Sequence, residues 1–76
     1  MPMEDIPFAI QEHIMLEITY MNQKGETSTR TVEPYEIKDG YFFAWDIAKD
    51  GIRCFFLSPS VLLDVKLLET RFIPRF

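Results

Sequence analysis

The 76-residue sequence is poor in the residues that build catalytic and metal sites, with one cysteine and one histidine. A single Cys54 excludes an intrachain disulfide, so the framework expected of a small secreted domain is missing. His13 and Cys54 make neither a zinc cluster nor a nucleophile–base pair of convincing spacing. The glycines (Gly25, Gly40 and Gly51) all fall in predicted turns, and none belongs to a phosphate-binding loop. We therefore expect no enzymatic activity, no metal and no cofactor.

Positive charge is also scarce, because 8 Lys and Arg face 12 Asp and Glu for a net charge of −4. Non-specific binding to a phosphate backbone depends on clustered cations, so it is disfavoured, although a local basic patch stays compatible with this charge. No apolar run approaches the roughly 20 residues that cross a bilayer. The acidic start, Met1 to Asp5, lacks the basic and apolar stretches of a signal peptide. We expect a cytoplasmic protein with no membrane partner.

What the chain does contain is apolar and aromatic: 47% of its residues are hydrophobic and 14% carry an aromatic ring. Such a composition is typical of a folded protein, and the length corresponds to one domain, residues 1–76. Large rings fill a small core efficiently and are well tolerated in strands.

The periodicity predicts one short helix followed by strands. Asp5 is placed to cap a helix that extends to about residue 11. Alternating or β-branched segments then predict strands at 13–20, 26–38, 41–46, 52–57 and 61–67. Pro34 predicts a bend or an edge, because it lacks the N–H that a central ladder needs. Asp39-Gly40 is typical of a two-residue type I′ hairpin.

Short apolar strands need to close on themselves to protect their edges, which favours a small antiparallel barrel of five strands. We expect residues 41–46 to be buried on both faces and Cys54 to be a buried, inert thiol. In the last strand we expect the apolar residues to share one face: Val61, Leu63, Val65 and Leu67.

An ordered set of residues carries a family resemblance over about residues 9–72. Its pieces are Ala9-Ile10, a strand ending at Tyr20, Arg30-Thr31-Val32-Glu33-Pro34, Gly40-Tyr41-Phe42-Phe43, and Arg53-Cys54-Phe55. This set resembles the WYL domain. That family has an Ala-Ile pair, a strand ending in Tyr, Arg-x-Val-x-Pro, a Gly before its Trp-Tyr-Leu signature, and Arg-x-Phe.

The resemblance implies an SH3-like (Sm-like) barrel and a ligand-sensing role. WYL domains accompany DNA-binding winged helices in bacterial transcription regulators, or phage-defence proteins, with a nucleotide or single-stranded nucleic acid as the suspected ligand. They also take part in dimer contacts. A helix-turn-helix does not fit in residues 1–12, so we expect either a standalone copy or a fragment of a larger regulator.

Carried over residue by residue, the resemblance implies a ligand site. Arg30 and Arg53 match the family's motif arginines and Tyr20 its strand-end tyrosine. A guanidinium suits phosphate oxygens and an aromatic face suits a base. The expected ligand-binding residues are Tyr20, Arg30, Tyr41, Arg53 and Phe55. The family often has further basic residues where this chain has Phe56 and Pro59, which weakens the expected phosphate site.

Two interpretations stay open for each part of this site. Arg30 and Arg53 equally suit surface ion pairs with Glu33, Glu17 or Asp46, and packing is favoured over ligand stacking for the aromatics Tyr20, Tyr41 and Trp45. The tail, residues 71–76, either folds over the barrel or contacts a partner. The alternative function is a protein-interaction or oligomerisation domain, such as a homodimer, with no nucleic-acid ligand.

Overall fold

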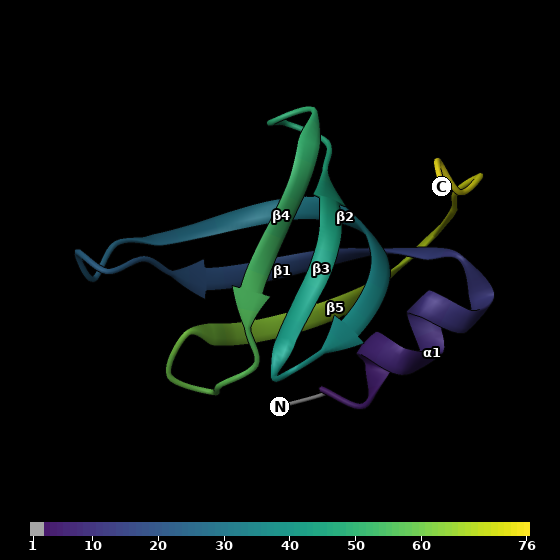
Figure 1. Ribbon diagram of the computed structural model, residues 1–76. Coiled ribbons are helices and arrows are strands. Elements are labelled where there is room, and N and C mark those ends of the chain that lie inside the picture. Colours follow the sequence, from purple (N-terminus) through teal and green to yellow (C-terminus); the bar gives the residue numbers. More distant parts are fainter. Residues whose placement is uncertain (1–2) are drawn as a thin grey trace.

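A computed structural model describes residues 3–76 as one helix and one antiparallel sheet (Figure 1). The strands follow the order β4-β3-β2-β1-β5 across the sheet. The elements are α1 (Asp5–Glu12), β1 (Ile14–Met21), β2 (Thr27–Lys38), β3 (Tyr41–Asp46), β4 (Gly51–Phe56) and β5 (Leu62–Arg71). The predicted helix and five strands are therefore confirmed, each within a few residues of its expected bounds.

The long strand β2 curls the sheet upon itself. Its first half pairs with β1 and its second half with β3, and Val32 faces Leu16 on one side and Asp46 on the other. The register shifts between Pro34 and Glu36, so the predicted bend at Pro34 is confirmed as a bulge. As a result β3 and β4 cross over β1, as Figure 1 shows, and the sheet has an inner, concave face.

The core lies on this inner face. Leu16, Ile18, Val32, Phe42 and Leu62 are fully buried there. Helix α1 contacts β1, β2 and β5 and adds two buried side chains, Ile6 and Ala9.

The ends of helix α1 differ from the sequence prediction. The N-cap residue is Glu4, and Asp5 is the first helical residue rather than the cap. His13 is not a strand residue, because it ends the helix in a left-handed conformation with its N–H donating to the Ala9 carbonyl.

The sheet is not closed, so the expected SH3-like barrel is not confirmed. Strands β4 and β5 are its two edges, and no ladder joins them within residues 3–76. Side chains occupy the space between β4 and β1 instead: the rings of Tyr20 and Phe55 meet at 5.1 Å, and Arg53 lies over Tyr20. What the structure establishes is a mostly β domain with a curled five-stranded antiparallel sheet and one short helix.

Three expectations about strand faces are wrong. Residues 41–46 are buried on one face only, because the core lies only on the inner face of the sheet. Cys54 is exposed, because it alternates along β4 with the inward-facing Arg53 and Phe55. In β5 it is Leu62 and Val65 that enter the core, not Leu63. A register shift opposite Thr19 and Tyr20 inserts one extra residue in β5 and turns the alternation over.

No helix within residues 3–76 is long and apolar enough to span a bilayer. The same range contains no cluster of three or more side chains suited to hold a metal ion.

Candidate ligand-binding site

The inner face carries a polar cluster at the end of the core, centred on Asp46. This carboxylate is the last residue of β3 and is fully buried. Its Oδ1 accepts hydrogen bonds from the backbone N–H groups of Ala48 (3.0 Å) and Lys49 (3.3 Å) and so closes the turn before β4. Its second oxygen, Oδ2, is left to face the inner side of the sheet.

Both motif arginines converge on that second oxygen. Arg53 Nη1 lies 3.5 Å and Arg30 Nε 4.0 Å from Asp46 Oδ2. Neither Oδ2 nor Arg30 Nε makes a hydrogen bond within the part of the chain that the structure describes. The contacts are thus electrostatic, with two guanidinium groups and one carboxylate leaving a local excess of one positive charge. About a third of each arginine side chain stays exposed, 35% for Arg30 and 28% for Arg53, so both can reach a ligand.

Aromatic rings flank the Arg53 guanidinium. Its carbon Cζ lies 5.1 Å from the ring centre of Tyr20 and 5.6 Å from that of Phe55, within the range of cation–π attraction. The two rings meet edge to face, and both residues are largely buried. Tyr20 comes from β1 and Phe55 from the crossing strand β4, so the curl of the sheet brings them together.

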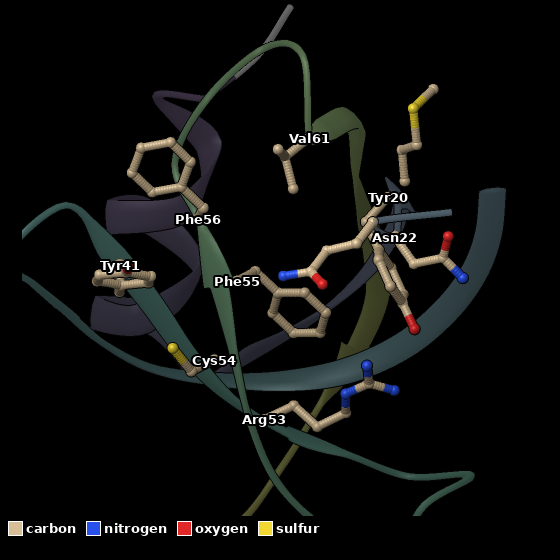
Figure 2. A pocket seen from close by; sticks show the side chains of 10 residues that line it. Tyr20, Asn22, Tyr41, Arg53, Cys54, Phe55, Phe56 and Val61 are labelled. Atoms are coloured by element: carbon tan, nitrogen blue, oxygen red, sulfur yellow. The ribbon is translucent and has the colours of Figure 1, made fainter. Parts of the chain in front are cut away.

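A pocket of about 550 Å³ opens beside these rings, along the unpaired edge of β4 (Figure 2). Figure 2 shows Arg53 and Phe55 on one side of β4, facing Tyr20, with Tyr41, Cys54 and Phe56 on the other side. Its remaining lining comes from the end of β1, the following turn and the residue before β5: Met21, Asn22, Gln23 and Val61. The pocket is therefore open where a closed barrel would pair its edges.

The structure brings four of the five predicted site residues to this pocket: Tyr20, Tyr41, Arg53 and Phe55. Arg30 does not line it, but meets Arg53 at Asp46. Tyr41 belongs to the outer face, where its ring packs against Phe56 at 5.5 Å, so it reaches the pocket only around the edge of β4. Packing thus accounts for Tyr41, as one sequence interpretation favoured.

The pairing partner of the arginines was one of three candidates in the sequence, and the structure selects Asp46. Glu17 and Glu33 point to the outer face, because they alternate with the buried Leu16 and Val32. A carboxylate at the end of a strand and before Ala48-Lys49-Asp50-Gly51 was the only sequence signal for this role. The pocket residues Asn22, Gln23 and Val61 carried no such signal.

Comparison with known proteins places the chain in a family. The model of the WYL domain matches residues 3–58, and the chain belongs to this family. A solved structure, the proteasome accessory factor B/C (PafBC) of Arthrobacter aurescens, is similar to it with a TM-score of 0.76 and 27% sequence identity. The match covers 90% of this chain and 11% of PafBC, so the chain spans about a tenth of that protein. Among curated proteins no significant match was found.

Proposed function

We propose that this chain is a non-enzymatic regulatory module that senses a nucleotide or a short single-stranded nucleic acid at the pocket along the edge of β4. The observation that carries the proposal is the convergence of Arg30 and Arg53 beside the rings of Tyr20 and Phe55. Membership of the WYL family fits a ligand-sensing role in transcription regulation, and we extend the proposed setting to phage defence.

Each part of such a ligand has a matching group in the site. Phosphate oxygens would accept hydrogen bonds from the guanidinium groups, which are held only loosely by Asp46. A base would contact Tyr20 and Phe55 where these largely buried rings line the pocket. The volume, about 550 Å³, lies in the range of pockets that take small ligands and suits one nucleotide.

The lining of the pocket also supports a binding role rather than catalysis. Its ionisable side chains are Tyr20, Tyr41, Arg53 and Cys54, and no carboxylate or imidazole is among the residues that line it. Imidazoles and carboxylates are the groups that most often act as general acids and bases. The nearest carboxylate, Asp46, is committed to its turn and to the arginines.

Fluorescence polarisation with short labelled DNA and RNA oligonucleotides at low salt tests this proposal. Replacing both arginines, Arg30→Ala with Arg53→Ala, should weaken binding by more than about tenfold, since two charge-assisted contacts are lost. The matched control is Lys38→Ala with Lys66→Ala, which removes the same charge from exposed positions outside the pocket. Equal effects of the two double variants, or no binding by the wild-type chain, would contradict the proposal.

A second candidate function, a protein-interaction or oligomerisation domain, rests on the outer face of β3 and β4. Tyr41, Ile52 and Phe56 are each between 41% and 49% exposed there. Apolar side chains gathered on one face are typical of a contact surface. Light scattering should then show a dimer that Phe56→Lys dissociates, whereas a monomer at all concentrations would leave this candidate without support.

A further inference from the structure

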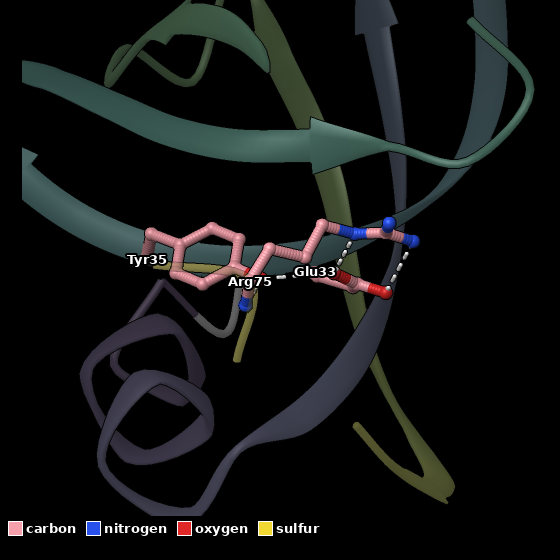
Figure 3. Close-up of polar contacts among 3 residues, drawn as sticks. All are labelled: Glu33, Tyr35 and Arg75. Carbon is pink, nitrogen blue, oxygen red and sulfur yellow. Dashed lines mark hydrogen bonds and ion pairs between the residues drawn. The ribbon is translucent and has the colours of Figure 1, made fainter. Parts of the chain in front are cut away.

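The outer face holds a second polar cluster, separate from the pocket, where residues 72–76 cross β2 and β3. Arg75 forms a forked ion pair with Glu33: Nε lies 2.9 Å from Oε1 and Nη2 lies 3.3 Å from Oε2 (Figure 3). Glu33 is only 6% exposed, although it belongs to the outer face. A buried carboxylate needs such a partner, because desolvation of an unpaired charge is costly.

Two aromatic residues complete the binding site around Arg75. Its guanidinium carbon lies 4.5 Å from the ring centre of Trp45, which faces Glu33 across the β2–β3 ladder. The Tyr35 hydroxyl donates to Glu33 Oε1 (2.9 Å) and accepts the backbone N–H of Arg75 (3.0 Å). The site therefore binds the charge, the flat face and the backbone of a single arginine. These are three independent constraints, and lysine would meet fewer of them.

The neighbouring residue of the tail is held by rings. Phe76 lies 5.1 Å from Tyr35 and 6.1 Å from Trp45, centre to centre. Phe76 still exposes 77% of its surface, and a pocket of about 520 Å³ continues beside it, lined by Tyr35, Phe43 and Ile52. The tail thus fills only part of the groove that it enters.

From these contacts we infer that the outer face carries a peptide-binding site for an arginine–aromatic segment of a partner protein, and that residues 72–76 of this chain occupy it as an internal competitor. The partner chemistry follows from the seated segment, since Glu33 and Trp45 select a guanidinium and Tyr35 an adjacent ring. The pocket beside Phe76, which Phe43 and Ile52 also line, offers a partner contacts that residues 72–76 do not make. Hydrogen bonding to the Glu33 carboxylate also raises the pKa of Arg75 above its ordinary value.

Trp45, the one tryptophan of the sequence, reports on this site through its fluorescence. Arg75→Ala in the 76-residue chain should change the Trp45 emission, because the cation and the adjoining ring leave the indole. That variant should then bind a synthetic peptide identical to residues 72–76, with recovery of the wild-type emission. The wild-type chain should bind the peptide at least about tenfold more weakly, since its own tail competes.

The same peptide carrying Arg75→Ala is the matched control and leaves the fold of the protein untouched. It should bind the Arg75→Ala chain at least about tenfold more weakly than the unchanged peptide, and Glu33→Gln in the chain should remove this preference. Equal binding of the two peptides, or an Arg75→Ala chain with unchanged Trp45 emission, would overturn the inference. A wild-type dimer that Arg75→Ala dissociates would also overturn the inference. It would show that the site formed by Glu33, Tyr35 and Trp45 binds the tail of a second copy of this chain.

Discussion

Asp46 has two roles at the scale of a single residue, because one oxygen closes a turn and the other faces two arginines. Its Oδ1 bonds to Ala48 and Lys49 make it a structural residue. Its Oδ2 partly neutralises Arg30 and Arg53, and any phosphate entering the site competes with it. The proposed affinity for nucleic acid is thus set by a balance between an internal and an external anion.

Replacing Asp46→Asn separates these roles. The amide keeps an acceptor for the turn but removes the charge, so oligonucleotide binding should become tighter by up to about fivefold, the equivalent of a partly exposed ion pair. Fluorescence polarisation measures the change, with Asp64→Asn as the control that removes a charge from the exposed side of β5. Unchanged or weaker binding by a folded Asp46→Asn chain would show that Asp46 does not compete with the ligand.

Tyr35 gives the outer face a pH dependence. Burial raises the pKa of Tyr35 above its ordinary value of 10.0, and hydrogen bonding to Glu33 acts in the same direction, whereas the Arg75 backbone N–H lowers it. Between pH 10.0 and its folded pKa, Tyr35 is therefore protonated when folded but ionised when unfolded. Tyr35 therefore contributes to the free energy of unfolding. This contribution is fully present below pH 10.0 and is lost as the pH rises through the folded pKa of Tyr35.

Urea unfolding on either side of pH 10.0 measures this effect. The wild-type chain should lose more stability with rising pH than the Tyr35→Phe chain, because only the wild-type chain has the Tyr35 hydroxyl. Tyr20 and Tyr41 are present in both chains, so the difference between them reports on Tyr35. Identical pH slopes for the two chains would contradict the assigned role of the hydroxyl.

At the scale of elements, the hairpins were predictable because their signals are local. Residues 41–46 were expected as a strand and are β3, and the Asp39-Gly40 turn before it has φ angles of 54° and 78°. Positive φ at both positions is what a type I′ turn requires. The extra residue in β5 was not predictable, because that bulge depends on the register against β1.

The β2–β3 turn gives a matched test of this conclusion. Gly40→Ala should destabilise the chain by about 1–2 kcal/mol, since alanine is strained at φ 78° even though no atom lies near its Cβ. Gly51→Ala, which also meets open space but at an ordinary φ, should change stability by less than about 0.5 kcal/mol. The midpoints of urea unfolding measure both, and equal effects would show that the turn conformation does not limit stability.

For the whole molecule, the open sheet relies on helix α1 for part of its core. Ile6 is fully buried, although it lies on a helix that precedes every strand. A domain of this size has only about 0.05–0.15 kcal/mol of stability per residue, so one large cavity removes much of the total.

Ile6→Ala should therefore lower the free energy of unfolding by about 2–5 kcal/mol, measured by urea or thermal unfolding. Phe8→Ala in the same helix is the control, because Phe8 is 50% exposed and its loss should leave the core intact. A small effect of Ile6→Ala would mean that the sheet is stable without the packing of α1.

The sequence by itself determined the β class and the turns, which depend on residues close along the chain. It also determined the family and the two motif arginines, which depend on the order of short motifs over residues 9–72. Only the tertiary structure decided that Arg30 and Arg53 share Asp46, that Arg75 is held by Glu33 and Trp45, and that β4 and β5 remain unpaired edges. Each of these features depends on residues that lie on different strands, or in the C-terminal tail, and far apart in the sequence. The bend at Pro34 was predictable, but the packing of side chains between the strands that it brings together was not. That packing joins residues far apart in the sequence, so no local pattern specifies it.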